Sequence, residues 1–214
     1  MTADQLRQFL PSLKEQSLAG ESAHRMLAPE ARRRFFDKHT DYQSFKPKQA
    51  AVMLLIFPDA REKMHLAFIK RHVYPGVHSD QIGFPGGKRE ETDAHFWHTA
   101  LRETQEEVGI SAATIQLIRP LSTVYIPPSN FEVFPFLAHC TDTPNWQLSP
   151  DEVQELIALP VAQLFDQQWL IEKELTFAND TKVLTPGFQW ESHFIWGATA
   201  MMLQELRMLL AGIN

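Results

Sequence analysis

The chain has one cysteine, no long apolar run and no excess of basic residues, and each shortage excludes a class of protein. With Cys140 alone among 214 residues, no disulfide can form within the chain, which fits a reducing compartment. The longest apolar run, 50–57, is far shorter than the roughly 20 residues of a membrane-spanning helix, and charges interrupt 1–16, where a signal peptide would be apolar. A net charge of −6 offers no basic surface for nucleic acid. We therefore expect a cytoplasmic protein that binds neither a membrane nor nucleic acid.

The overall composition, with 44% hydrophobic and 21% charged residues, is that of an ordinary globular domain. Helical spacing of apolar residues predicts helices over 2–16, 22–36, 93–108 and 197–210. Short apolar runs and alternation predict strands over 50–57, 63–73, 114–126, 131–140, 152–160, 169–176 and 181–195. Asp93 is expected to cap the third helix and Gly109 to end it, after an irregular glycine-rich segment, 74–92. This order predicts an α/β (α+β) fold, a mixed sheet packed against helices.

Three glutamates crowd one face of the predicted helix 93–108. Glu106 and Glu107 lie three and four positions after Glu103, so the three carboxylates share a face of the helix. Their repulsion costs a few tenths of a kcal/mol per exposed pair (roughly 0.2–0.5 kcal/mol), and acids near the C-terminal end also oppose the helix dipole. A solvated acidic face is the alternative, but no basic residue follows Glu103 or Glu106 at the fourth position. Carboxylates beside a glycine loop instead predict a hard-oxygen site for Mg²⁺ or Mn²⁺.

The segment from Gly87 to Ile110 resembles the Nudix box, in which a glycine and an acid precede Arg-Glu-x-x-Glu-Glu-x-Gly. The second half is intact, as Arg102-Glu103-Thr104-Gln105-Glu106-Glu107-Val108-Gly109. The first acid is Asp93 instead of glutamate, and eight residues instead of seven separate it from Arg102. We interpret Asp93 as a loop anchor that either pairs with Arg102 or caps the helix, and not as a metal ligand.

The resemblance implies the Nudix fold, a mixed sheet between helices, with an N-terminal helical extension at 1–45 before a Nudix hydrolase domain at 46–214. It implies metal-dependent hydrolysis of a nucleoside diphosphate derivative. The metal ligands that it implies are Glu103, Glu106, Glu107 and the carbonyl of Gly86. Glu103 and Glu106 are also expected to be catalytic. The residues expected to hold the loop and helix in place are Asp93, Arg102, Gly87 and Gly109.

Residues outside the box are similar to coenzyme A diphosphatases over roughly 49–210. Arg71, the sequence Phe84-Pro85-Gly86-Gly87 and the run from Ile195 to Ala200 match, whereas Gly76 and Asp80 stand where the pattern expects arginine and glycine. The resemblance predicts coenzyme A or its thioesters as substrate, giving 3′,5′-ADP and 4′-phosphopantetheine. The residues expected to bind the substrate are Arg71, Lys88 and Phe84. The alternatives are ADP-ribose or another dinucleotide-like substrate, and a non-catalytic protein of this fold that senses a nucleotide.

Two further expectations concern the later part of the chain. Nudix enzymes often bring one more acid to the site, and we prefer Glu152 over Glu155 for this catalytic role; a surface strand of alternating polarity is the alternative. The predicted C-terminal helix and the N-terminal helices carry more apolar side chains than one small sheet face would cover, which predicts a homodimer. The side chains concerned are Phe194, Ile195, Trp196, Met201, Met202, Leu206, Leu209, Leu210, Phe9, Leu10, Phe35 and Phe36.

Overall fold

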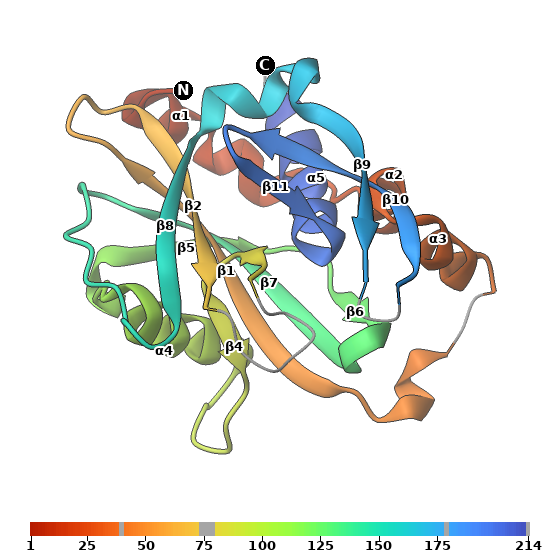
Figure 1. Cartoon of the computed structure of the whole chain (residues 1–214). Coiled ribbons are helices and arrows are strands. Elements are labelled where there is room, and N and C mark those ends of the chain that lie inside the picture. Colours follow the sequence, from red (N-terminus) through yellow and green to blue (C-terminus); the bar gives the residue numbers. More distant parts are fainter. Residues whose placement is uncertain (39–40, 73–79, 178–179, 213–214) are drawn as a thin grey trace.

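The computed structural model describes residues 1–38, 41–72, 80–177 and 180–212 (Figure 1). The predicted irregular segment is therefore described from Asp80 onward, and 73–79 lie outside the described residues. The helices are α1 (Ala3–Glu15), α2 (Glu21–Leu27), α3 (Glu30–Asp37), α4 (Phe96–Val108) and α5 (Gly197–Ala211). The single helix predicted over 22–36 is wrong, because the chain leaves helical geometry at Ala28 and Pro29 before α3 begins. Proline lacks an N–H and disfavours helical geometry in the residue before it.

Within the described residues, eight strands form one mixed sheet and three form a second, antiparallel sheet. The larger sheet contains β1 (Lys48–Pro58), β2 (Met64–Arg71), β3 (Ile82–Gly83), β4 (Gly86–Lys88), β5 (Ile115–Pro120), β6 (Val124–Ile126), β7 (Phe131–Cys140) and β8 (Val153–Pro160). The second contains β9 (Leu170–Thr176), β10 (Lys182–Trp190) and β11 (His193–Trp196). β1 and β7 run parallel, and the other paired strands run antiparallel.

Two predicted strands are each divided in the structure. The strand expected over 114–126 ends at Pro120, and β6 starts again at Val124, so both pieces pair with β7 at different places. The strand expected over 181–195 turns back at Glu191, whose φ is +50°, and forms the β10–β11 hairpin.

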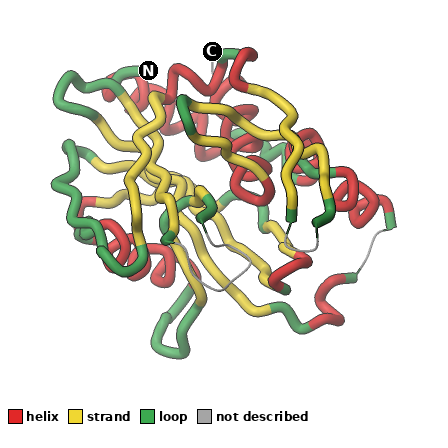
Figure 2. The backbone as a smooth tube through the Cα atoms, in the orientation of Figure 1, coloured by secondary structure: helices red, strands yellow, loops and turns green. Residues whose placement is uncertain are grey.

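The central strand β1 is buried on both faces, and this explains its continuous apolar run. Leu54 and Ile56 pack in a core shared with α1, α2 and α5. Met53 and Leu55 point to the other side, into a core shared with α4. The sheet thus lies between α4 on one face and the N- and C-terminal helices on the other (Figures 1 and 2). The predicted mixed sheet between helices is confirmed.

The N-terminal helices and α5 belong to one core. Leu6, Leu13 and Leu27 are buried in the same cluster as the apolar face of α5. Glu205 of α5 is also buried, and its carboxylate accepts hydrogen bonds from the backbone N–H groups of Gly20, at 2.8 Å, and Ser122, at 3.0 Å. The α5 side chains behind the homodimer prediction are covered within one chain, so that argument no longer supports a dimer. In the described part of the chain, no helix has the length and apolar character to cross a membrane.

Candidate active site

Helix α4 starts and stops at specific polar contacts. Its N-cap is His95, whose ring accepts a hydrogen bond from the His98 N–H, so the expectation that Asp93 caps the helix is wrong. Gly109 ends the helix in the left-handed conformation, with φ of +74°, and its N–H donates to the Gln105 carbonyl. The predicted stop at Gly109 is confirmed, and it follows from the freedom of glycine at positive φ.

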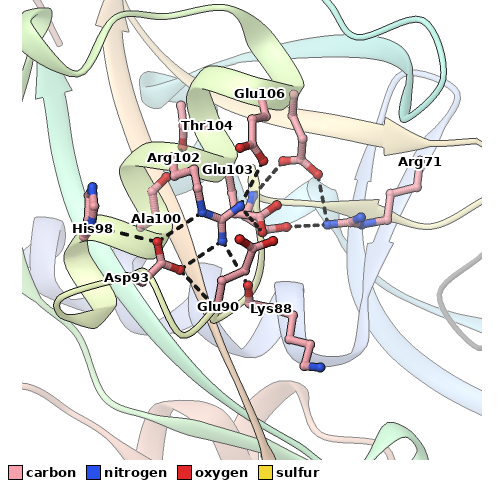
Figure 3. Close-up of polar contacts among 12 residues, drawn as sticks. Arg71, Lys88, Glu90, Asp93, His98, Ala100, Arg102, Glu103, Thr104 and Glu106 are labelled. Atoms are coloured by element: carbon pink, nitrogen blue, oxygen red, sulfur yellow. Dashed lines mark hydrogen bonds and ion pairs between the residues drawn. The ribbon is translucent and has the colours of Figure 1, made fainter.

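Asp93 anchors the loop before α4 through Arg102. The Arg102 guanidinium donates to both Asp93 oxygens, at 3.1 and 3.0 Å, and to the Lys88 carbonyl at 3.1 Å (Figure 3). Asp93 also accepts from the Glu90 N–H at 3.0 Å. The hydrogen bonds from Arg102 hold the pKa of the buried Asp93 carboxyl well below its usual range. Of the two interpretations of Asp93, pairing with Arg102 is therefore the one observed.

Glu107 lies almost fully buried between β4 and β2. One carboxylate oxygen, Oε2, accepts the Gly86 N–H at 2.7 Å, and the other, Oε1, lies 3.3 Å from Arg71 Nη2. The same Nη2 donates to the Gly86 carbonyl at 2.6 Å. Burial raises the pKa of Glu107 to about 8, against the lowering effect of Arg71 and of the Gly86 N–H. The charge of this carboxylate is thus poorly solvated, and a cation beside it would stabilise that charge.

Arg102 is also the cation that compensates the other two glutamates of α4. Its Nη1 lies 3.0 Å from Glu103 and 2.9 Å from Glu106 (Figure 3). The basic partner of Glu106 therefore stands four residues before it in the helix, and not at a following position. Glu103 is mostly covered, with 16% of its side chain exposed, whereas Glu106 is 54% exposed. The predicted metal-binding and catalytic roles of Glu106 stay predictions.

The two glycines of β4 allow close approach to the acids. A Cβ on Gly86, whose φ is +148°, would lie 2.3 Å from the Ala51 carbonyl oxygen. A Cβ on Gly87 would lie 2.3 Å from a Glu103 carboxylate oxygen. Glycine at both positions therefore lets the backbone of β4 lie directly against β1 and the acids of α4.

A cavity of about 420 Å³ collects residues from four separate segments. It is lined by Arg71, His72, Gly87, Lys88, Glu103, Glu107, Asp151 and Glu152. The lining includes Glu152, whereas Glu155 lies 3.3 Å from His193 in an ion pair, which favours the choice of Glu152. His72 and Asp151 were missed by sequence reasoning, and the one available signal was that each adjoins a residue already chosen.

The expectation that Phe84 contacts the substrate needs correction. Its side chain is 2% exposed and stacks on Phe68, with 4.7 Å between ring centroids. Phe84 is part of the core below β4 and is absent from the cavity lining. Its predicted substrate contact came from its position in the motif, which does not report burial.

The donor atoms around the cavity fit a divalent cation. As the side chains stand, no three acids, histidines or cysteines among the described residues are grouped to hold a metal ion by themselves. Mg²⁺, however, commonly takes one or two carboxylates and completes its shell with water and substrate phosphates. Glu103, Glu107 and the Gly86 carbonyl supply hard oxygen donors, and buried Glu107 is a carboxylate that needs a positive neighbour. These residues would hold the ion.

Acids and basic side chains around one cavity are typical of a hydrolase that acts on phosphorylated small molecules. Comparison with known sequences identifies the family of hydrolases concerned. A family model described as the NUDIX domain matches residues 47–179, and the chain belongs to the Nudix family. The family comprises hydrolases of nucleoside diphosphate derivatives that generally use divalent metal ions, and this chain is a hydrolase of that kind.

Individual relatives agree with the family assignment. The chain is 29% identical, over 165 residues, to an uncharacterised Nudix hydrolase, NudL, from Salmonella paratyphi B; the match covers 77% of this chain and 84% of NudL. The fold is similar to that of the Nudix hydrolase RenU from M. smegmatis, with a TM-score of 0.53, 16% identity and coverage of 78% and 88%. It is also similar to the NUDIX domain of Shewanella oneidensis NrtR, solved with ADP ribose, with a TM-score of 0.50, 15% identity and coverage of 85% and 98%.

Proposed function

We propose that the protein is a Mg²⁺- or Mn²⁺-dependent diphosphatase that cleaves coenzyme A or its thioesters into 3′,5′-ADP and 4′-phosphopantetheine. The observation that carries the proposal is the cavity in which Glu103, Glu107 and Glu152 meet Arg71 and Lys88. Carboxylates there suit a metal ion, and the two basic side chains suit the oxygens of a diphosphate. The choice of coenzyme A rests on the resemblance of Arg71, the Phe84–Gly87 sequence and the Ile195–Ala200 run to coenzyme A diphosphatases.

Each cavity residue has a distinct part in the proposed reaction. Arg71 and Lys88 hold the diphosphate, and Glu103, Glu107 and the Gly86 carbonyl hold the metal ion. The bound ion would neutralise the diphosphate and lower the pKa of a water molecule. Glu152 would accept the proton of a water molecule that attacks one phosphorus; the phosphoanhydride P–O bond breaks, and the bridging oxygen leaves with the other phosphate.

A substrate panel tests the proposal. The protein is incubated with coenzyme A, acetyl-coenzyme A or ADP-ribose in the presence of Mg²⁺ or Mn²⁺, and products are separated by chromatography. We expect 3′,5′-ADP and 4′-phosphopantetheine from coenzyme A, and no products after the metal is chelated. Turnover of ADP-ribose alone would overturn the choice of coenzyme A and leave a Nudix diphosphatase of another substrate. Tight nucleotide binding without any products would favour the alternative of a non-catalytic protein of this fold that senses a nucleotide.

A further inference from the structure

The guanidinium of Arg71 occupies two oxygens that the proposed function gives to a metal ion. Its Nη2 donates to the Gly86 carbonyl at 2.6 Å and lies 3.3 Å from Glu107 Oε1. The other carboxylate oxygen of Glu107 already accepts the Gly86 N–H. A cation that binds both Gly86 and Glu107 therefore competes with Arg71, because the guanidinium already takes one acceptor site on the Gly86 carbonyl and lies beside Glu107 Oε1, and two positive charges this close repel each other.

Arg71 and Arg102 are attached to the site in different ways. Arg102 makes hydrogen bonds to both Asp93 oxygens and to the Lys88 carbonyl, which hold it in place whatever the glutamates bind. Within the described part of the chain, the Arg71 side chain instead contacts Gly86 and Glu107, the groups proposed to bind the metal ion. Its backbone is fixed separately, since its N–H donates to the Gln81 carbonyl at 3.1 Å. Release of the Arg71 side chain therefore requires no movement of β2.

We propose that the metal ion displaces Arg71 from Gly86 and Glu107, and that the released guanidinium then binds the substrate diphosphate. This rests on the proposed function and adds a coupling to it. Arg71 competes with the metal before substrate arrives and becomes available for phosphate once the metal is bound. A freed guanidinium in the cavity presents a bidentate fork to phosphate oxygens, so metal and diphosphate bind more tightly together than either does alone. Arg71 thus couples metal binding to substrate binding, in addition to contacting the substrate.

The first test measures Mg²⁺ affinity by calorimetry without substrate. We compare the parent protein with Arg71→Met and with Lys182→Gln, which removes one positive charge from an exposed ion pair on β10. We expect Arg71→Met to bind Mg²⁺ about tenfold more tightly, and Lys182→Gln to match the parent. Unchanged or weaker Mg²⁺ binding by Arg71→Met would overturn the displacement.

The second test separates displacement from simple repulsion between two cations. Methylene-bridged ADP, a diphosphate that resists hydrolysis, is titrated with and without Mg²⁺. In the parent, Mg²⁺ strengthens binding both by direct contact and by releasing Arg71; in Arg71→Met only direct contact remains. We expect the strengthening to be about tenfold smaller in the variant. Equal strengthening in both proteins would overturn the coupling.

The controls distinguish this inference from the proposed function. Thermal melting in chelator verifies that Arg71→Met is folded, and Arg71→Gln, which is also uncharged, replaces it if it is not. A parent protein that binds neither Mg²⁺ nor Mn²⁺ and cleaves no diphosphate with either ion would overturn both proposals. A parent that binds Mg²⁺ and cleaves coenzyme A, with Arg71 variants that leave Mg²⁺ affinity unchanged, would overturn the displacement alone.

Discussion

At the scale of single residues, the three glutamates of α4 differ in what surrounds them. Glu107 is buried against Gly86, Glu103 is mostly covered beside Gly87, and Glu106 is half exposed on Arg102. Burial also raises the pKa of Glu103. Helical spacing predicts the same acidic face for all three residues, whereas packing places Glu103 and Glu107 in the cavity lining and leaves Glu106 outside it.

Glu103→Gln is expected to lower hydrolysis by at least about 100-fold while the protein stays folded. The amide keeps the shape of the side chain but loses the charge that would hold Mg²⁺. Glu106→Gln should cause a smaller loss, because its carboxylate is exposed and faces Arg102. The measurement is a Mg²⁺ titration of activity for each variant, with melting curves as the control for folding. Parent-like activity in Glu103→Gln would show that Glu103 does not hold the metal ion.

Glu107 should make the metal-free protein less stable as pH rises. Its pKa of about 8 in the folded state lies above the ordinary value of 4.5. The folded state therefore holds the proton more tightly, so this contribution is complete below about pH 4.5 and is lost as pH passes through about 8. In chelator, the parent should lose on the order of 3 kcal/mol more than Glu107→Gln between pH 5 and pH 9. Denaturant unfolding at several pH values measures this, and parallel profiles would contradict it.

At the scale of elements, β4 holds the acids of α4 close to the backbone of β1. Its two glycines meet different neighbours, the backbone of Ala51 at Gly86 and the end of a side chain at Gly87. Backbone cannot move aside without disturbing β1, whereas the Glu103 side chain can rotate.

Gly86→Ala is therefore expected to destabilise the whole fold, by about 2 kcal/mol or more, through steric overlap and backbone strain. Gly87→Ala should leave the unfolding free energy within about 1 kcal/mol of the parent, yet abolish most hydrolysis by turning Glu103 away. Denaturant unfolding and kcat, measured on both variants, separate the two effects. A fully active Gly87→Ala protein would show that Glu103 does not need its observed position.

The contact between α5 and the N-terminal helices depends on Glu205. Burial raises the pKa of this carboxyl, but the His24 ring, 3.7 Å away, and the hydrogen bond from the Ser122 N–H outweigh burial and lower the pKa to about 2. This depressed pKa stabilises the fold above about pH 4.5, and the contribution is lost as pH falls through about 2. Glu205→Gln leaves one backbone N–H without an acceptor oxygen and should cost about 1–3 kcal/mol at pH 7. Exposed Glu15→Gln is the matched control, and equal stabilities would contradict the role of Glu205.

At the scale of the whole molecule, the N-terminal extension lies inside the main core although the family model begins only at residue 47. The predicted boundary between 1–45 and 46–214 therefore separates a region outside the match to the family model from the region that contains it. That the two regions are separate domains stays a prediction. The homodimer also stays a prediction. Light scattering distinguishes a 24.6 kDa monomer from a species of twice that mass.

Deletion of residues 1–45 is expected to prevent cooperative folding. It removes Leu6, Leu13 and Leu27 from the core and uncovers the apolar face of α5. The fragment 46–214 should show a broad, early melt by circular dichroism and should aggregate in gel filtration. A fragment that melts cooperatively and hydrolyses the substrate of the parent would show that the Nudix domain folds by itself.

Features of the fold and site that depend on neighbouring residues alone could be predicted from the sequence. The apolar run of β1, the bounds of β7 and the glycine stop of α4 follow from neighbouring residues, as does the acidic cluster, because one helical turn brings 103, 106 and 107 together. Packing between distant segments buries Glu107, places Phe84 in the core and brings Arg71 and Glu152 to the same cavity, and none of this could be predicted from local sequence. Periodicity reports which face of an element is apolar, whereas burial and ion pairing depend on which distant segments pack against that face.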